Sequence, residues 1–241
     1  MLPGMLSSLK YRRVLLKLSG EALSSAGRSI DSGKLKVVVS EIQALRRLGV
    51  ELALVVGGGN IWRKREQGQG MDEVTADYLG MLATVMNALA IRQALQRGRI
   101  KTRVLSYLAC DLPLVNRITK QTVQMAFKRG EVLILAGGTG KPFFTTDTAA
   151  ARGAALIKAE VLVKAGPVDG AYTANPRRIK QAKKFKTLTI KEARARQLKV
   201  MDKQAFAICA RKKIPIVVCR WQSGNIVKVV RGKKVGTEVT V

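Results

Sequence analysis

The sequence predicts an α/β fold, a three-layer αβα sandwich in which helices cover both faces of a mainly parallel central sheet. Short runs of aliphatic and β-branched residues alternate along the chain with longer amphipathic segments, which is the pattern of successive β-α-β units. Glycine clusters also follow directly after several of the short runs, as they do at strand-to-helix turns. A chain of 241 residues is long enough to give one such domain a well-buried core.

The expected elements follow this alternation. Strands are expected at residues 13–19, 51–56, 103–107, 131–136, 161–164, 214–220 and 226–231, with a short last strand near the C-terminus. Helices are expected at residues 32–48, 75–97, 119–129, 146–158, 190–196 and 201–213. Asp31 and Gly49 are typical boundary residues for the first helix. We expect residues 1–10 to form a tail and residues 11–241 a single domain, in which the basic stretch 177–186 is the best candidate for a mobile surface loop.

The composition excludes several kinds of chemistry. The chain has no histidine, which removes Ser-His-Asp and Cys-His nucleophiles, imidazole acid–base catalysis and histidine metal sites. Its three cysteines, Cys110, Cys209 and Cys219, form no C-x-x-C pair, so reduced thiols are expected rather than a disulfide framework or a zinc site. Any catalysis must therefore depend on Lys, Arg, Asp and backbone amides.

The charge balance is strongly basic. Lys and Arg number 44 against 16 Asp and Glu, a formal net charge of +28 that favours contact with polyanions. The apolar runs are far shorter than the roughly 20 residues of a membrane-spanning helix, and the N-terminus does not resemble a secretory signal. We expect a cytoplasmic protein with no membrane contact.

Three glycine turns follow predicted strands, at residues 17–20, 57–60 and 137–140. Ligands of open α/β sheets bind beyond the carboxyl ends of the strands, where glycines let backbone N–H groups approach phosphates. Three such turns together indicate a nucleotide. Trp62 breaks the dinucleotide fingerprint, and Pro142 after Gly140 and Lys141 breaks the P-loop, so a Rossmann dehydrogenase and a P-loop kinase are both disfavoured.

Seven segments spread over nearly the whole chain carry a family resemblance. They are 16–23 (LKLSGEAL), 55–60 (VVGGGN), 70–89, 138–147 (GTGKPFFTTD), 168–172 (VDGAY), 199–202 (KVMD) and 215–218 (PIVV). In these segments the chain resembles the bacterial-type UMP kinases (uridylate kinases) of the amino-acid kinase family. The resemblance implies the amino-acid kinase fold, with an acceptor (UMP) half at about 11–158 and a donor (ATP) half at about 159–241.

The resemblance also implies an activity. Family members transfer the γ-phosphoryl group of ATP to UMP with Mg²⁺, giving UDP and ADP in pyrimidine nucleotide biosynthesis. They are typically homohexamers that GTP activates and UTP inhibits. The expected partners are therefore ATP, UMP and further copies of the chain.

The resemblance assigns roles to residues of this sequence. Lys17 is the expected catalytic lysine, and a flexible ammonium suits a charge that moves between donor and acceptor oxygens. Asp147 and Asp202 receive electrostatic or Mg²⁺-linked roles, while the metal ligands stay unknown because ATP phosphates carry most of the Mg²⁺ coordination. The expected ATP-binding residues are Lys17, Leu18, Ser19, Gly20, Gly59, Arg63, Gly166, Tyr172 and Asn175. The expected UMP-binding residues are Gly58, Asp77, Thr139, Gly140, Lys141, Pro142, Phe143, Phe144, Thr145 and Thr146.

Some of these assignments have alternatives. Asp77 is expected to bind the UMP ribose hydroxyls; an N-terminal capping role in its helix is the alternative, and the two roles are compatible. Phe143 and Phe144 are expected to pack the segment around them rather than to stack on a base. Arg63 is expected to hold phosphate with its planar fork, although one arginine in so basic a chain could also be solvated.

The sequence departs from the family at five positions. Gly166 and Pro167 replace the usual Thr and Lys, Asn175 replaces Asp, Lys141 replaces Asn, and Lys64 stands where Gly is common. Three of the five lie in the donor half, so donor affinity and donor choice are the properties most open to change.

Two other functions compete with this interpretation. The first is another small-molecule kinase of the same fold, acting on a carbamate, a carboxylate or a phosphonate. The second is a basic nucleic-acid-binding protein on the kinase scaffold, including nonspecific RNA contact, although aromatic residues make up only 5% of the chain and offer few stacking platforms. A basic surface adapted to the host cytoplasm would explain the same charge.

Overall fold

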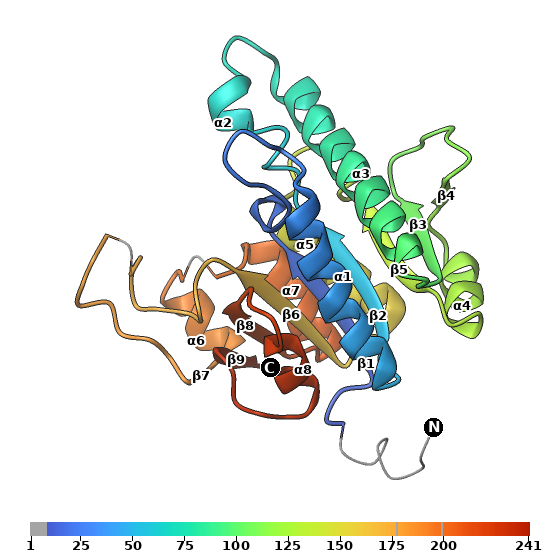
Figure 1. Cartoon of the computed structure of the whole chain (residues 1–241). Coiled ribbons are helices and arrows are strands. Elements are labelled where there is room, and N and C mark those ends of the chain that lie inside the picture. Colours follow the sequence, from blue (N-terminus) through green and yellow to red (C-terminus); the bar gives the residue numbers. More distant parts are fainter. Residues whose placement is uncertain (1–8, 177, 199) are drawn as a thin grey trace.

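A single nine-stranded sheet organises the molecule (Figure 1). The computed structural model describes residues 9–176, 178–198 and 200–241. The strand order is β4-β3-β5-β2-β1-β6-β8-β9-β7, and every neighbouring pair is parallel except β8 and β9. The strands are β1 (Arg13–Leu18), β2 (Glu51–Val56), β3 (Thr102–Ser106), β4 (Val115–Arg117), β5 (Val132–Ala136), β6 (Val161–Gly166), β7 (Thr187–Thr189), β8 (Ile216–Arg220) and β9 (Thr237–Thr240).

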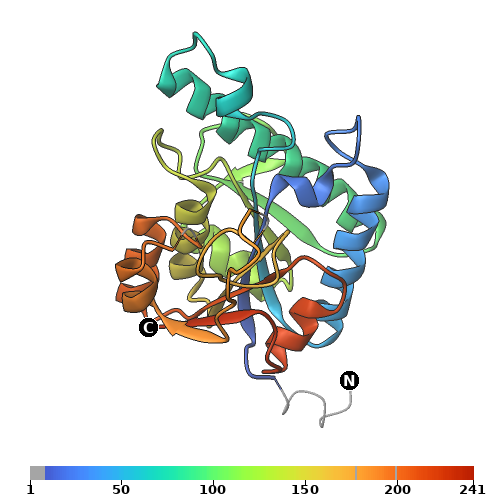
Figure 2. The ribbon, with the colours of Figure 1, turned by 90° about the vertical axis from the view of Figure 1, so that its left-hand side faces the viewer.

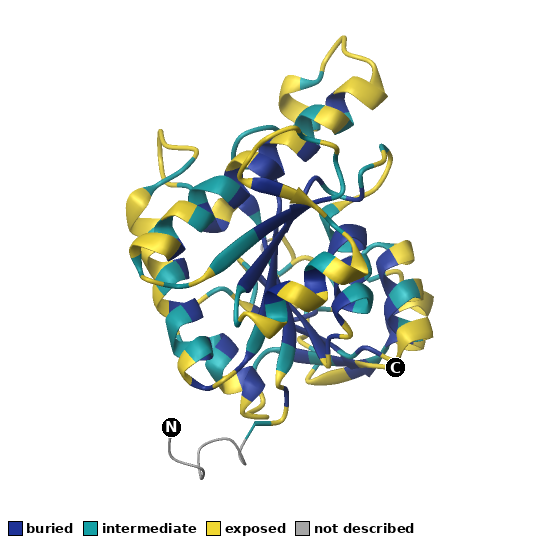
Figure 3. Cartoon of the chain, turned by 90° about the vertical axis from the view of Figure 1, so that its right-hand side faces the viewer, coloured by how far each residue is buried: buried dark blue, intermediate teal, exposed yellow. Residues whose placement is uncertain are grey.

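Helices cover both faces of this sheet, which confirms the predicted three-layer sandwich (Figure 2). They are the 3-10 helix η2 (Gly20–Leu23) and the α-helices α1 (Ser32–Arg47), α2 (Lys64–Gln67), α3 (Glu73–Arg97), α4 (Lys120–Lys128), α5 (Thr146–Ile157), α6 (Ile190–Ala195), α7 (Lys203–Lys212) and α8 (Asn225–Val230). Helices α1, α3 and α8 share one apolar core with the sheet, and α4, α5, α6 and α7 share the other. The burial pattern follows, with the strands dark between two half-exposed helical layers (Figure 3).

Strand β1 illustrates how the sequence specifies this arrangement. Successive side chains of a strand point to opposite faces. Leu16 and Leu18 therefore enter the core beside α1, and Leu15 enters the core beside α5. By the same alternation, Lys17 points toward the α5 layer.

One predicted strand is wrong. Residues 225–230 form helix α8 rather than a strand, because Ile226, Val229 and Val230 recur at helical spacing and are buried on one side. The buried carboxylate of Glu41 on α1 also accepts hydrogen bonds from the backbone N–H groups of Gly224 (2.7 Å) and Ile226 (3.1 Å), which satisfies the start of that helix. The elements η2, α2, β4 and β7 were not predicted.

Helix α3 is long and apolar enough to cross a membrane by length and composition alone. In the fold it packs against β3, β5 and β2 as a core helix, and its N-terminal end projects with α2 beyond the rest of the molecule (Figure 1). The helix begins at Glu73, and Asp72 caps it by accepting a hydrogen bond from the Thr75 N–H (2.9 Å). The capping interpretation of Asp77 is therefore wrong, because Asp77 lies inside the helix.

All three cysteines are free, as predicted. Cys209 and Cys219 are buried free thiols, and burial raises the pKa of each to about 12, which leaves them unreactive at neutral pH. Cys110 is half-buried and also free. Arg177 lies outside the described residues, whereas residues 178–186 return along the chain so that Lys184 pairs with Tyr172 in an antiparallel bridge. The mobility of this stretch remains a prediction.

Candidate active site

The glycine turns meet at one edge of the sheet. Strands β5, β2, β1 and β6 are neighbours and parallel, so their carboxyl ends lie side by side. The chain leaves β1 toward β2 on one side, and β6 leads to β8 on the other, so the crevice between β1 and β6 is the topological switch point of the sheet. This is where open α/β sheets bind ligands.

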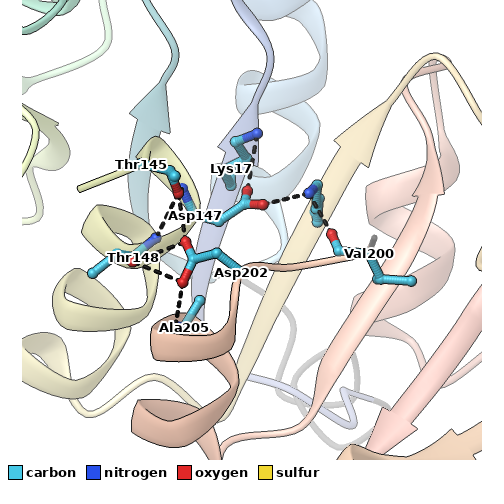
Figure 4. Close-up of polar contacts among 8 residues, drawn as sticks. Lys17, Thr145, Asp147, Thr148, Val200, Asp202 and Ala205 are labelled. Carbon is cyan, nitrogen blue, oxygen red and sulfur yellow. Dashed lines mark hydrogen bonds and ion pairs between the residues drawn. The ribbon is translucent and has the colours of Figure 1, made fainter. Parts of the chain in front are cut away.

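Two lysines stand opposite each other at this switch point. Lys17 on β1 is the register partner of Lys164 on β6, and both side chains point toward α5. Like charges placed directly opposite on neighbouring strands repel each other. The carboxylate of Asp147, in the first turn of α5, resolves this repulsion: its Oδ1 lies 3.1 Å from the Lys17 Nζ and its Oδ2 lies 2.6 Å from the Lys164 Nζ (Figure 4).

The three side chains form a buried charge cluster. Their exposed fractions are 12% for Lys17, 14% for Asp147 and 22% for Lys164. Burial raises the pKa of Asp147, but the two ammonium groups outweigh burial and hold the pKa below its ordinary value. Burial lowers the pKa of Lys164, and Asp147 opposes that effect. The cluster is a carboxylate kept ionised so that it can hold two amines in place.

The two amines are held differently. Lys164 donates hydrogen bonds to Asp147 Oδ2 and to the carbonyl oxygen of Val200. Asp147 Oδ1 is buried and faces Lys17 across an ion pair of 3.1 Å, and no second acceptor for the Lys17 ammonium is found among the described residues. Lys17 is consequently the amine that is freer to move toward a ligand, and Lys164 is the fixed one.

Asp202 reinforces the cluster from α7. It caps that helix by accepting a hydrogen bond from the Ala205 N–H (2.8 Å), and it also accepts hydrogen bonds from the hydroxyls of Thr145 and Thr148 (Figure 4). Thr145 in turn caps α5 by accepting a hydrogen bond from the Asp147 N–H (3.0 Å). The Asp202 carboxylate thus joins the starts of α5 and α7 and fixes where Asp147 stands.

The first two glycine turns interlock. A Cβ added to Gly20 would lie 2.2 Å from Asn60 Oδ1 and 2.8 Å from the Gly57 carbonyl oxygen, so only glycine fits there. The amides of Asn60 and Asn87 exchange hydrogen bonds of 2.9 and 2.8 Å, and Asn87 also donates to the Gly57 carbonyl (2.8 Å). Asn87 is fully buried in α3, so this helix fixes the shape of both turns.

Within these turns, the predicted phosphate contacts have different surroundings. A Cβ on Gly58 would meet the Gly80 carbonyl at 2.7 Å, so Gly58 is held tightly against α3. Gly59 is open apart from the Arg63 side chain, 3.9 Å away. The Arg63 guanidinium pairs with Glu21 at 2.7 Å, and Ser19 precedes η2 without a side-chain cap. The Leu18 side chain lies in the core, so only its backbone can face a nucleotide.

The third glycine turn depends on left-handed backbone. Gly137, Gly138 and Gly140 have φ values of 72°, 56° and 74°, and the Gly137 N–H donates to the Thr84 hydroxyl (2.9 Å). Thr139 is buried, and its hydroxyl donates to the Lys141 carbonyl (3.1 Å). The start of the turn is thus held against α3, and its end at Gly140 lies against Tyr107.

The acceptor residues beyond this turn correct one prediction. Phe143 does not pack the segment, because 64% of its surface is exposed and its φ has the unusual value of 66°. Phe144 is 38% exposed, so for this residue packing remains a prediction. What fixes the segment is its backbone: the Phe143 N–H donates to Asp77 Oδ2 (2.7 Å). The Lys141 side chain is exposed, Pro142 is half-buried, and Thr146 begins α5 beside Gly57.

Asp77 is fully engaged by protein groups. Its second oxygen, Oδ1, pairs with the Lys64 ammonium at 3.1 Å. Lys64 is one of the five departures from the family, and it occupies the carboxylate predicted to bind ribose. A sugar at this position would have to displace that lysine.

The donor residues surround a separate cavity of about 490 Å³ that reaches Lys164. Tyr172 and Asn175 line it, and Gly166 ends β6 nearby with no atom within 4 Å of an added Cβ. The Tyr172 hydroxyl donates to Asp169 (2.6 Å), which also pairs with Lys184 (2.8 Å). The hydrogen bond from Lys184, followed by that from Tyr172, lowers the pKa of Asp169 to about 2.

The described residues offer no preformed metal site. No group of three or more Asp, Glu or Cys side chains gathers in the part of the chain that the structure describes. Both Asp147 oxygens face lysines, and the Asp202 oxygens face hydroxyls and a backbone N–H. The residues therefore do not fit a metal centre of their own.

Two residues of this site, Lys164 and Asn87, were not predicted from the sequence. Lys164 was visible as a charged residue inside the apolar strand VLVKAG, and Asn87 as an amide inside the apolar helix segment around it. A polar group at a buried position of a regular element requires a partner, and here the partners are Asp147 and the Gly57–Asn60 turn. Lys199, in one of the motifs, lies outside the described residues.

The family match and the similar structures identify the chain as a phosphotransferase of the kinase type. The sequence model of the Amino acid kinase family matches residues 12–220, and the chain belongs to that family. Three solved structures are similar to it over nearly its whole length. A UMP kinase from Bacillus anthracis is 31% identical with a TM-score of 0.91, over 95% of this chain and 96% of that one.

The second and third structures extend the comparison. A UMP kinase from Ureaplasma parvum is 33% identical with a TM-score of 0.88, over 97% and 100% of the two chains. A uridylate kinase from Archaeoglobus fulgidus is 30% identical with a TM-score of 0.73, over 94% and 99%. The fold is thus that of UMP kinases from distant sources.

Proposed function

We propose that this protein is a UMP kinase that transfers the γ-phosphoryl group of ATP to UMP, giving UDP and ADP in pyrimidine nucleotide biosynthesis in the cytoplasm. The observation that carries the proposal is the Lys17–Asp147–Lys164 cluster at the switch point, beside three glycine turns. The similarity to UMP kinases at 31% and 33% identity supports the choice of acceptor.

The chemistry follows from the charges. A UMP phosphate oxygen forms a bond to the γ-phosphorus of ATP while the bond from that phosphorus to the β,γ-bridging oxygen breaks, so ADP leaves with the electron pair. Phosphoryl transfer depends on positioning and on stabilising charge rather than on covalent catalysis. Lys164, anchored at two acceptors, supplies a fixed positive charge, and Lys17 can follow the negative charge from the γ-phosphoryl oxygens to the bridging oxygen.

The residues around the lysines supply the positioning. Backbone N–H groups of the Gly57–Asn60 and Gly137–Gly140 turns support acceptor and donor phosphates, and Asp77 supports the UMP ribose. Donor adenosine fits the cavity lined by Tyr172 and Asn175, which opens toward Lys164. Mg²⁺ would be carried on the ATP phosphates, where it neutralises their charge, since the described residues lack a metal centre of their own.

The quaternary structure and regulation remain predictions from the resemblance. Exposed apolar side chains at Val74, Tyr78, Leu82 and Met86 lie along α3 at helical spacing, which supports contact with another copy of the chain. A homohexamer would concentrate the net charge of +28, so its self-repulsion should make assembly stronger in higher salt. GTP activation and UTP inhibition belong to the same prediction.

An acceptor panel tests the proposal. A coupled assay with ATP and Mg²⁺ against UMP, CMP, dTMP, GMP and AMP should give strong turnover of UMP alone. Lys17→Ala should lower kcat by a factor of about 10²–10³, the effect of removing one well-placed electrostatic donor, while Lys36→Ala on the exposed side of α1 should not change it. A folded protein that phosphorylates none of the five, or a fully active Lys17→Ala, would contradict the proposal.

A further inference from the structure

A second cavity, of about 620 Å³, lies on the other face of the sheet. Tyr11, Val217 and Val229 line it and belong to the apolar core of α1, α3 and α8, whereas the Lys17–Lys164 pair faces the α5 layer. Its remaining wall comes from the segment leading into β7, the loop between α8 and β9, Glu238 of β9 and Lys10 before β1. It is therefore distinct from the candidate active site. We call it the lysine cavity.

The lysine cavity is named for its charged lining. Five lysines and one glutamate line it: Lys10, Lys184, Lys186, Lys233, Lys234 and Glu238. Lys10 pairs with Glu238 at 2.9 Å, and Lys184 pairs with Asp169 at 2.8 Å. The other three ammonium groups have no carboxylate within 4.0 Å among the described residues. The lining thus carries excess positive charge that the protein itself does not neutralise.

A solvated basic loop would explain lysines on a convex surface, but this lining is concave. A cleft of one charge sign with apolar walls focuses its field, because the walls have a low dielectric constant. The apolar floor also gives the lysine stems a surface to lie on, and all five lysines line the same cavity. The ligand that relieves the repulsion between such amines is a compact anion with several charges.

One of the lining lysines connects the lysine cavity to the donor side of the active site. Lys184 lies so close to Gly170 that a Cβ there would be 2.7 Å from its Cε, and its ammonium holds Asp169. Asp169 holds the Tyr172 hydroxyl, and Tyr172 lines the donor cavity. The backbone follows the same route, since Phe185 N–H donates to the Ala171 carbonyl (2.9 Å).

We propose that the lysine cavity binds a small multivalent phosphate anion, such as a triphosphate chain. The bound anion draws Lys184 away from Asp169 and loosens the donor wall, the segment 170–176 that lines the donor cavity. Binding depends only on the five lysines. The effect on the donor side rests on the function proposed above. The two parts therefore need separate measurements.

Binding is tested by calorimetric titration of inorganic triphosphate into the full chain. Lys233→Ala/Lys234→Ala should weaken the affinity by about tenfold or more, since two charge-assisted contacts are lost. Lys34→Ala/Lys36→Ala, with the same loss of charge on exposed positions of α1, should not. The wild-type affinity should fall as salt rises.

Three outcomes would overturn the proposed site. If both double variants weaken binding equally, the anion responds only to net charge. If Lys17→Ala abolishes binding and Lys233→Ala/Lys234→Ala does not, the anion occupies the active site alone. If a short single-stranded RNA binds through Lys233 and Lys234 while triphosphate does not bind, the cavity serves a nucleic-acid backbone rather than a small anion.

The link to the donor wall is tested by hydrogen exchange of residues 169–186 in the Lys17→Ala protein, where binding at the catalytic lysine is weakened. Triphosphate should speed amide exchange in this segment, and Lys233→Ala/Lys234→Ala added to Lys17→Ala should remove the effect. If amide exchange in this segment is unchanged or slower when triphosphate binds, Lys184 does not transmit the effect of binding to the donor side. Neither result depends on kinase activity, so the two proposals can fail separately.

Discussion

The glycine turns of the N-terminal half and the segment after β6 are held in place by different means. Buried side chains fix the turns: Asn87 holds the Gly57–Asn60 turn, and Thr84 holds the turn at Gly137. The segment after β6 combines one buried hydrogen bond, from the Ala171 N–H to the Thr237 hydroxyl (2.9 Å), with the more exposed pair of Lys184 and Asp169, which keep 33% and 44% of their side-chain surfaces in solvent. Exposed ion pairs contribute little to stability, so the donor wall is the more easily altered half of the site.

Three of the five departures from the family lie in the more exposed donor half. Gly166, Pro167 and Asn175 all belong to the donor side, and an added Cβ at Gly166 meets nothing within 4 Å. Glycine in place of the usual Thr at position 166 therefore costs no packing contacts. The tightly packed turns, by contrast, keep every glycine that their geometry requires. The other two departures, Lys64 and Lys141, lie in the acceptor half, so the contrast holds for three of the five positions.

The largest expected effect comes from Asp147. Asp147→Asn would leave Lys17 and Lys164 opposite each other without a counter-charge, which should destabilise the fold by about 3–5 kcal/mol, the range for breaking a buried pair on one side. Denaturant unfolding measures this. Adding Lys164→Met should restore most of the stability but not the activity. An Asp147→Asn protein of wild-type stability would contradict the role given to the cluster.

A pair of glycine substitutions separates the two regions directly. Gly20→Ala should destabilise the protein by about 1–3 kcal/mol, the range for overpacking, because the new Cβ would lie 2.2 Å from Asn60 Oδ1. Gly166→Ala makes the same chemical change in open space and should leave the melting temperature unchanged. Equal effects at the two positions would remove the contrast between a packed and an open half.

Lys64→Gly should have a smaller effect on kinetics. It frees Asp77 Oδ1 for the UMP ribose, so the KM for UMP should fall by a factor of about 2–5, consistent with an ion pair worth less than about 1 kcal/mol. The kcat should stay the same. A higher KM after the substitution would mean that Lys64 itself helps to bind UMP.

The smallest effect concerns the donor wall and pH. Because folding lowers the pKa of Asp169 to about 2, its pair with Lys184 stabilises the wall above about pH 3.8 and is lost as the pH falls through about 2. An NMR titration of the Asp169 carboxyl carbon should have its midpoint near 2, and Lys184→Ala should move it toward 3.8. If the midpoint is the same in Lys184→Ala as in the wild type, a group other than Lys184 keeps the pKa of Asp169 low.

Much of the fold was predictable from the sequence because its signals are local. The alternation of strands and helices, the cap at Asp31 and the glycine turns each depend on a few neighbouring residues, and all are present. The error at residues 225–230 has the same origin. A short β-branched run fits a strand or a helix equally well, and the buried Glu41 that caps α8 is far away in sequence.

The site was predictable only where a motif marked it. Lys17 and Asp147 lie in motifs. The role of Lys164 can be inferred only from its position opposite Lys17, which requires knowing that β1 pairs with β6. The exposure of Phe143 and the capture of Asp77 by Lys64 likewise arise from tertiary contacts. Such contacts are set by packing between segments, which periodicity along the chain does not encode.

The most direct test of the central claim is a single-turnover measurement of UDP formation at increasing UMP concentration, comparing the wild type with Lys17→Ala and Asp77→Asn. We expect Lys17→Ala to lower the maximal rate by about 10²–10³-fold, with little change in the UMP concentration that gives half of that rate. Asp77→Asn should raise that concentration and leave the maximal rate nearly unchanged. Identical behaviour of the two variants, or no UDP from the wild type, would contradict the assignment of phosphoryl transfer to the Lys17–Asp147–Lys164 cluster.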